Sequence, residues 1–339
     1  MLRRLFLFIC AIALSFPPVF AEAASYKSGK HKVTAVSKSK AKAKLSKRKI
    51  SSRRISHTIR SSRNYGAHVA SYTLQGAQFQ QDGNDTELRL ESSKALILNQ
   101  DTGEVLYAKN IGLTTPIASV TKLMTAMVVL DAHQPMDDPV TVTSADVDIL
   151  KGTGSRLRVG TTLTRAEMLQ LALMSSENRA ASSLGHAYPG GYDAFVRAMN
   201  AKALALGMTR SVFIDATGLN SENVSTAEDL AKMVKAAYQY PEIRQVTTTA
   251  AYEVPLHGPN RPVEFRNTNI LVRNSDWQIG LSKTGFINEA GRCLVMQAQI
   301  AEQPLIIVLL DSWGKFTRIG DAQRIRKWIE SSNGARKLG

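Results

Sequence analysis

Three short motifs in this chain carry side chains that together can open an amide bond through a serine ester without a histidine. In chain order they are Ser119-Val-Thr-Lys122, Ser176-Glu-Asn178 and Lys283-Thr-Gly285. The first supplies a hydroxyl nucleophile and an amine, the second a hydroxyl and an amide, and the third a cation. The chemistry they predict is acyl transfer by a serine whose general base is a lysine.

Each motif alone is weak, because the chain repeats its pattern elsewhere. Ser-x-x-Lys also begins at Ser37, Ser39 and Ser46, Ser-x-Asn at Ser62 and Ser221, and Lys-Ser-Gly at Lys27. Most of these copies lie in a low-complexity basic stretch that cannot build a pocket. Ser221-Glu-Asn223 is the real competitor, and we interpret it as structural because it lies in a Gly- and Asn-rich turn. The order of the three motifs and their local setting therefore carry the prediction.

The segment that follows Ser119 is predicted to be a buried helix. Residues 120–132 are apolar on nearly every face, which is typical of the centre of a domain. Lys122 is three residues from Ser119, so the two Cβ atoms are expected about 5–6 Å apart on one face. Lys122 can accept the serine proton only when it is neutral. Burial or a neighbouring cation lowers a lysine pKa, and Lys283 is a candidate for that cation.

The elements around the motifs predict a mixed α/β domain. A hairpin is expected over 94–109, with Gly103 supplying a positive φ in the turn. The middle of the chain is helical, with capping boxes at Thr164–Glu167 and Ser225–Glu228. Three strands near 279–286, 293–300 and 305–311 and a helix at 318–329 close the chain. Short connections between these strands imply antiparallel pairing.

The first 24 residues are predicted to be an export signal. Arg3 and Arg4 precede an apolar run at 5–16, and small residues follow at 21–24. We expect a basic tail and linker over 25–87, a catalytic domain over 88–331 and a short tail over 332–339. The protein is thus expected to be exported to the periplasm, free or peripherally attached to membrane or wall.

The net charge of +15 is concentrated in the tail. Residues 26–64 hold 14 Lys or Arg and no acid, whereas 27 basic and 27 acidic residues follow Asn64. A segment this poor in large apolar residues cannot bury enough surface to fold. It is either a solvated linker or an attachment to an anionic envelope surface. Nucleic acid is not an expected partner, because the protein is exported.

Cysteine and histidine do not indicate a metal or a cofactor. Cys10 leaves with the signal, so Cys293 is the only remaining thiol, and its apolar strand-like setting predicts a buried small residue. The six histidines have no metal-ligand spacing. Their spacing leaves a Ser-His-Asp triad open, although nothing favours one.

Longer stretches around the motifs resemble the low-molecular-mass penicillin-binding proteins, the serine DD-peptidases of peptidase family S11. The stretches are Ser119-Val-Thr-Lys-Leu-Met-Thr, Met174-Ser-Ser-Glu-Asn-Arg-Ala-Ala, Asp215-Ala-Thr-Gly-Leu, Asn267-Thr-Asn-Ile-Leu and Lys283-Thr-Gly-Phe-Ile-Asn-Glu-Ala-Gly. The resemblance covers 88–329 and is greatest to the D-alanyl-D-alanine endopeptidases of the family. It implies a β-lactamase/DD-peptidase-like fold, a five-stranded antiparallel sheet flanked by helices.

The resemblance also implies a role for each motif residue. Ser119 would be the acylated nucleophile and Lys122 its base, with Ser176 relaying the proton and Asn178 orienting Lys122. In the third motif, Lys283 and Thr284 would bind the substrate carboxylate, and Gly285 would keep the strand edge open for a peptide. The oxyanion hole would be formed by the backbone N–H groups of Ser119 and Phe286.

The function implied is cleavage of D-alanyl cross-links between peptidoglycan stem peptides, with β-lactams as covalent inhibitors. A DD-carboxypeptidase that removes a terminal D-alanine is the nearest alternative, since it uses the same machinery. A β-lactamase is disfavoured, because the sequence has no clear counterpart of the extra glutamate of the class A enzymes. A non-catalytic wall-binding protein on the same scaffold is the alternative of another class.

Overall fold

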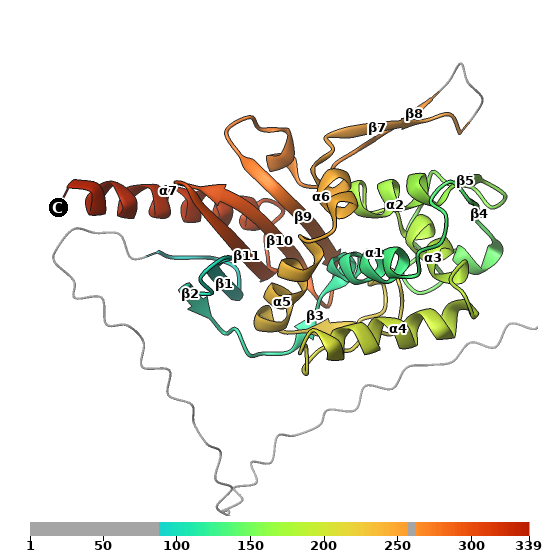
Figure 1. The fold of residues 1–339 in the computed structure, drawn as a ribbon, viewed down its shortest axis with the longest axis horizontal. Helices are drawn as coiled ribbons and strands as arrows, with labels where there is room; N and C mark the ends of the chain where they lie inside the picture. Colours follow the sequence, from blue (N-terminus) through green and yellow to red (C-terminus); the bar gives the residue numbers. More distant parts are fainter. Residues whose placement is uncertain (1–87, 257–261, 339) are drawn as a thin grey trace, which may run out of the picture. The chain divides into compact units, whose positions relative to one another are not determined.

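The computed structural model describes residues 88–256 and 262–338 (Figure 1). The signal predicted at 1–24 and the basic tail and linker predicted at 25–87 lie outside the described residues. Within the described ranges, none of the helices combines the length and the apolar character that crossing a bilayer requires.

A five-stranded sheet forms one half of the described region. Its strands are β1 (Lys94–Asn99), β2 (Val105–Lys109), β9 (Gln278–Ile287), β10 (Gly291–Ile300) and β11 (Gln303–Ser312). Their spatial order is β2-β1-β11-β10-β9, and every neighbouring pair is antiparallel. The five-stranded antiparallel sheet and the hairpin over 94–109 are therefore confirmed. β9, which carries Lys283, is an edge strand of this sheet.

The sheet is covered on both faces, as the alternation of side chains in its strands requires. In β11, Ile306, Val308 and Leu310 pack into the cluster formed with the central helices. The intervening residues Leu305, Ile307 and Leu309 pack against α7 (Thr317–Leu338) on the other face. The sequence predicted that this helix ends at 329, but it continues to Leu338.

The other half of the region is helical (Figure 1). The helices are α1 (Lys122–Asp131), α2 (Arg165–Met174), α3 (Asn178–His186), α4 (Gly191–Ala205), α5 (Ala227–Ala237) and α6 (Pro241–Thr248). The short elements between them are η1 (Ala118–Thr121), η2 (Ser144–Asp146), η3 (Ile270–Arg273), β3 (Thr115–Pro116), β4 (Pro139–Thr141), β5 (Thr162–Thr164), β6 (Val224–Ser225), β7 (Ala251–Val254) and β8 (Val263–Arg266). A turn of 3₁₀ helix, η1, thus leads directly into α1.

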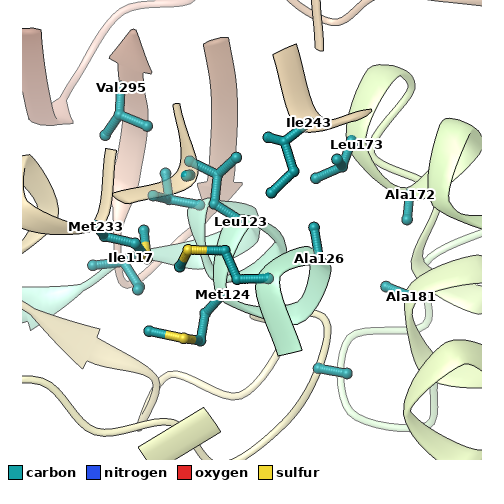
Figure 2. Packing of buried hydrophobic residues seen from close by; sticks show 14 of the residues in the cluster. Ile117, Leu123, Met124, Ala126, Ala172, Leu173, Ala181, Met233, Ile243 and Val295 are labelled. Atoms are coloured by element: carbon teal, nitrogen blue, oxygen red, sulfur yellow. The ribbon is translucent and has the colours of Figure 1, made fainter. Parts of the chain in front are cut away.

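The buried central helix predicted after Ser119 is confirmed as α1. All side chains from Lys122 to Val129 are buried. Figure 2 shows Leu123, Met124 and Ala126 surrounded by side chains of α2, α3, α5, α6 and β10. Because α1 contacts both the sheet and the other helices, its first turn is fixed where the two halves meet. Lys122 lies in that first turn, and Ser119 lies in η1 directly before it.

One predicted helix cap is confirmed and the other is wrong by one residue. Thr164 and Glu167 form a reciprocal capping box at the start of α2. At the start of α5 the cap is Thr226, whose side chain accepts from the Asp229 N–H at 3.2 Å. Ser225 is unavailable because it pairs with Thr115 in the β3–β6 ladder.

Candidate active site

Lys122 lies at the centre of the site and contacts all three acceptors within its reach. Its Nζ donates to Ser119 Oγ at 2.8 Å, to Asn178 Oδ1 at 2.8 Å and to the Thr217 carbonyl at 2.7 Å. Its side chain is fully buried. Three partners match the three protons of a lysine ammonium, so a neutral Lys122 has one lone pair to direct at a neighbouring hydroxyl proton.

Burial lowers the pKa of Lys122 from 10.5 to about 7, although the carboxylates of Asp215 and Glu177 oppose the shift. A lysine in this range is neutral in about half of the molecules at neutral pH. The sequence pointed to Lys283 as a cation that would depress this pKa, and here the structure differs. Burial lowers the pKa of Lys283 well below its usual value, and the charge of Lys122 lowers it further. Burial, and not the charge of Lys283, is therefore what lowers the pKa of Lys122.

The second motif occupies the corner between α2 and α3. Ser176 has a φ of 61°, a left-handed conformation that is strained for a serine. This backbone places Ser176 Oγ where Lys283 Nζ donates to it at 2.9 Å. Asn178 begins α3 and is held from both ends, since its Oδ1 accepts from Lys122 and its Nδ2 donates to Thr153 Oγ1 at 3.0 Å. The motif thus connects the first motif with the third.

The third motif lies in edge strand β9 against the turn that bears Ser119. Lys283 and Thr284 are buried, and Thr284 Oγ1 donates to Thr268 Oγ1 at 2.7 Å. A Cβ added to Gly285 would lie 2.9 Å from the Ile117 oxygen and 3.0 Å from the Ser119 nitrogen. Only glycine lets the strand approach this closely. All predicted site residues are therefore brought together, with Phe286 half exposed beside them.

A loop that carries no predicted catalytic residue shapes the base of the site. The Asp215 carboxylate accepts from the N–H groups of Thr217, Gly218 and Asn220 at 2.5, 2.6 and 2.8 Å. This network aims the Thr217 carbonyl at Lys122 Nζ. Gly218 has a φ of 80°, and a Cβ there would lie 1.9 Å from the Ala118 oxygen. The Asp-x-x-Gly pattern indicates a turn, but nothing in the sequence indicates that this turn packs against Ala118.

Asn223, from the competing Ser-x-Asn motif, supports that loop. It is fully buried, and its Oδ1 accepts from the N–H groups of Ile214 and Asp215. Its Nδ2 donates back to the Asp215 carbonyl at 3.1 Å. The structural interpretation of Ser221-Glu-Asn223 is therefore confirmed.

Arg318, in the first turn of α7, was missed by sequence reasoning. Its charge contributes to the lowered pKa of Lys283, so the two side chains are close. The pKa of Arg318 is itself lowered by burial and by Arg292. Its Nε and Nη1 are buried and have no hydrogen-bond partner. Buried donors of this kind are costly, so the group is suited to an anion. No motif flags it, because it lies 35 positions after Lys283.

Comparison with known proteins agrees with this geometry. Residues 80–314 match the D-alanyl-D-alanine carboxypeptidase family. The chain belongs to that family. It is 50% identical over 249 residues to a D-alanyl-D-alanine endopeptidase of Pseudomonas aeruginosa, covering 74% of this chain and 80% of the relative. It is 49% identical over 242 residues to a D-alanyl-D-alanine endopeptidase of Escherichia coli, covering 71% and 78%.

A solved structure supports the same assignment. The Streptomyces K15 DD-transpeptidase has a TM-score of 0.67 and 28% identity, over 72% of this chain and 98% of that one. The predicted DD-peptidase-like fold is therefore confirmed. In this family member the predicted side chains form two hydrogen-bonded groups, Lys122 with Ser119 and Asn178, and Lys283 with Ser176.

The alternative Ser-His-Asp triad is excluded within the described part of this DD-peptidase. The one such grouping there is Ser182, His186 and Asp146. His186 Nδ1 lies 2.9 Å from Asp146 Oδ1 and 3.4 Å from Ser182 Oγ, while Ser182 donates to the same Asp146 oxygen. A triad needs the serine and the acid on opposite ring nitrogens. Since both face Nδ1 here, the grouping is structural.

A loop over 148–153 connects the two sides of the site. The Asp148 carboxylate accepts from the N–H groups of Leu150 and Thr153 at 2.8 Å, which fixes the loop internally. Thr153 then accepts from Asn178, on the helical side. Lys151 Nζ lies 2.5 Å from Glu289 Oε1, in the turn between β9 and β10. The loop therefore spans from the second motif to the strand that carries the third.

Cys293 has no part in the site. It is buried in the cluster between the sheet and the helices, and burial raises the pKa of its thiol to about 11. A thiol with such a pKa is not a nucleophile at neutral pH. The prediction of a buried small residue is confirmed.

Proposed function

We propose that this protein is a serine DD-endopeptidase that cleaves D-alanyl cross-links of peptidoglycan through an ester on Ser119. The observation that carries the proposal is the 2.8 Å hydrogen bond from a buried Lys122, with a pKa of about 7, to Ser119 Oγ. Family membership supports the DD-peptidase reaction. The endopeptidase preference is supported by two relatives at 50% and 49% identity that carry that name.

Acylation begins when neutral Lys122 takes the Ser119 proton. The Ser119 Oγ–carbon bond forms, and the carbonyl oxygen becomes an oxyanion held by the N–H groups of Ser119 and Phe286. Gly285 supports this pairing, because it lets β9 approach to contact distance from the Ser119 nitrogen. A donor of this kind contributes roughly 10²–10³-fold in rate. The carbon–nitrogen bond then breaks as Ser176 relays to the leaving amine the proton that Lys122 took, which leaves Lys122 neutral for the second step.

Deacylation follows the same path with water as the nucleophile. Lys122, neutral again, takes a proton from the water as the new bond forms, and Ser119 leaves with a proton returned to Oγ. A β-lactam is trapped after the first step, because its ring-opened amine stays attached and obstructs the water. The proposal therefore includes inhibition by β-lactams.

The substrate carboxylate beside the scissile bond is assigned to Lys283, Thr284 and Arg318. Lys283 has a pKa far below normal because it is buried near two cations. An anion in this position raises that pKa again, so Lys283 gains its charge as substrate binds. Arg318 offers two buried donors without partners. Gly285 leaves the edge of β9 free to receive an extended peptide.

The proposed setting is the periplasm, which the predicted signal at 1–24 supports. A separate experiment tests whether residues 26–64 attach the protein to an anionic envelope surface. Binding to anionic vesicles is measured with and without that segment, and attachment requires that binding be lost without the segment and weaken as the ionic strength rises.

A DD-carboxypeptidase is the second candidate, because the family description itself names that activity. The test is to incubate the mature protein with cross-linked muropeptide dimers and with pentapeptide monomers, and to resolve the products by mass. Dimers converted to monomers, with penicillin blocking the reaction, support the endopeptidase. Loss of only a terminal D-alanine makes the protein a carboxypeptidase.

Ser119→Ala is the matched control for this experiment. It removes the nucleophile and leaves the rest of the site in place, so it must form no covalent penicillin adduct and cleave neither substrate. If the wild type cleaves neither substrate, and the variant retains penicillin as well as the wild type does, the protein is a non-catalytic wall-binding protein.

A further inference from the structure

Three aromatic side chains are exposed at one end of the sheet, beside the third motif. Phe286 follows Gly285 in β9 and is 50% exposed. Trp313 and Phe316 lie in the turn between β11 and α7 and are 98% and 60% exposed. A tryptophan with almost its entire surface in water does not contribute to the core. Exposed aromatic rings that lie together are characteristic of binding surfaces.

The register of the strands leads from Phe286 across the sheet to the start of the turn that bears Trp313 and Phe316. Phe286 of β9 pairs with Arg292 of β10, and Arg292 pairs with Ser312 of β11. Trp313 follows Ser312 directly. The guanidinium carbon of Arg292 lies 4.4 Å from the centre of the Phe286 ring. Since neighbouring strands are about 4.8 Å apart, the row Phe286–Arg292–Trp313 extends roughly 10 Å from the oxyanion residue Phe286.

The row is basic. Arg292, Lys315 and Arg318 belong to it, and Lys315 Nζ lies 5.4 Å from the centre of the Phe316 ring. Two acids in the adjoining strand end and turn are already paired, Asp311 with Lys94 at 3.1 Å and Glu289 with Lys151 at 2.5 Å. Three cations beside paired acids leave an excess of positive charge. This surface complements an anionic ligand.

The turn that bears Trp313 has a fixed backbone. The Gly314 N–H donates to Thr317 Oγ1 at 3.1 Å, and the Thr317 N–H donates back to the Gly314 carbonyl at 3.3 Å. α7 then begins at Thr317. The exposed ring of Trp313 is therefore carried on a defined support, which lowers the entropy cost of binding.

We propose that the row Phe286–Arg292–Trp313, with Lys315 and Phe316, binds the leaving half of a cross-linked substrate, an anionic stem peptide. The inference rests on the proposed function and specifies the substrate of the same site. The carboxylate at Lys283 and Arg318 belongs to the residue that supplies the leaving nitrogen. The rest of that stem peptide extends past Arg318 toward Trp313.

This surface distinguishes the two candidate reactions. In a carboxypeptidase reaction the leaving group is a single D-alanine, which ends at its own carboxylate and cannot span roughly 10 Å. In an endopeptidase reaction the leaving group is a whole stem peptide with further carboxylates. Contacts at Trp313 and Lys315 therefore stabilise the transition state for cross-link cleavage alone.

The test compares Trp313→Ala, Lys315→Gln and the double variant with the wild type. The readouts are kcat/KM for a cross-linked dimer, kcat/KM for a pentapeptide monomer, and the rate of penicillin acylation. Each single variant is expected to lower the dimer-to-pentapeptide ratio about tenfold, and the double variant more. Leu204→Ala, which removes another exposed apolar side chain, from α4, must leave the ratio at the wild-type value.

A ratio that stays at the wild-type value in all three variants overturns the inference, as does an equal loss on both substrates. These outcomes differ from failure of the proposed function. In that case the wild type itself cleaves no dimer, whatever residue occupies position 313. Circular dichroism and penicillin acylation of each variant establish that it is folded and has a working Ser119.

Discussion

A single proton on Lys122 links catalysis and stability in this protein. The Nζ has three acceptors within 2.8 Å, yet it is taken so far from water that its pKa falls to about 7. The hydrogen bonds favour the ammonium form and burial favours the amine. The balance between the two leaves a base that is half available at neutral pH.

The first prediction concerns the pH dependence of acylation. Because Lys122 acts when it is neutral, the second-order rate of penicillin acylation is expected to rise tenfold per pH unit below about 7 and to level off above it. Stopped-flow measurement between pH 5 and 9 locates the midpoint. A midpoint near 10 would mean that the amine is solvated and that the base is another group.

The second prediction concerns stability, where the lowered pKa has a definite sign. The unfolded chain binds the Lys122 proton more tightly than the folded protein does, so unfolding free energy rises with pH between about 7 and 10.5. Between pH 7 and pH 9 this group contributes an increase of about 2 kcal/mol. Below pH 7 both states carry the proton and the contribution stops changing.

Lys122→Met removes that titration while keeping the volume. Between pH 7 and pH 9 the free energy of unfolding, measured by urea denaturation, must increase by about 2 kcal/mol more in the wild type than in the variant. The variant must also be inactive toward penicillin. Parallel pH profiles for the two proteins would place the Lys122 amine in water.

At the scale of elements, the site depends on a loop and a strand that both approach the turn of the nucleophile without side chains between them. The Asp215 loop reaches the turn of Ala118 and Ser119 at Gly218, and β9 reaches it at Gly285. Ala118 and Ser176 both have left-handed backbones, with φ of 48° and 61°. Strained residues on either side of the nucleophile are held by the packing of α1 and α2 around them.

The third prediction tests this close approach with Gly218→Ala. The new Cβ would lie 1.9 Å from the Ala118 oxygen, and because both groups belong to backbones, the nucleophile's turn has to move. A displacement of about 1 Å is expected to lower penicillin acylation by 100-fold or more. Gly207→Ala is the matched control, because its φ of 70° is similar but its Cβ would meet open space. Equal activities of the two variants would show that only backbone strain matters.

How far the sequence predicted these elements depends on whether the signal was local. The hairpin, the buried helix and the strand pattern were predictable because apolar periodicity reports burial at each position. The cap of α5 was misplaced because Ser225 and Thr226 are equally good caps, and only the β3–β6 pairing decides between them. Arg318 was missed because strands β9, β10 and β11 bring Lys283 near the start of α7, and no local sequence pattern indicates that proximity.

The site residues were predictable for a related reason. Three motifs in order left few ways to assemble a nucleophile, and the resemblance to a family supplied the roles. The sequence left open whether burial or a neighbouring cation lowers the pKa of Lys122, because the burial of a side chain is decided by the packing of the whole core. It also gave no sign that the 148–153 loop reaches Asn178 through Thr153 and Glu289 through Lys151.

At the scale of the whole molecule, the two ends of the described region are joined. β1, near the start, pairs with β11, and α7 covers the same face of the sheet. Asp321 of α7 completes the closure. Its buried carboxylate accepts from the Glu91 N–H at 3.0 Å, from the Ser92 N–H at 2.8 Å and from the Ser92 hydroxyl at 2.5 Å.

The last prediction is that Asp321→Ala destabilises the protein without altering its chemistry. The variant leaves the N–H groups of Glu91 and Ser92 without their acceptor, while the Ser92 hydroxyl keeps its contact with Ser312 Oγ; unsatisfied buried groups of this kind cost about 1–3 kcal/mol each. The free energy of unfolding is therefore expected to fall by about 3 kcal/mol, as measured by urea denaturation. Penicillin acylation by the folded variant should match the wild type, because Asp321 touches no residue of the site.

Glu330→Ala provides the comparison on the same helix. Glu330 pairs with Arg326 at 2.8 Å, but both side chains are substantially exposed, so water and salt screen the pair. Its loss should cost at most about 1 kcal/mol. Both variants remove one carboxylate from α7, so a difference between them reports the effect of burial and not of charge. If both variants lose the same small amount, the closure between residues 91–92 and α7 does not hold the sheet together, and the β1–β11 pairing carries that role alone.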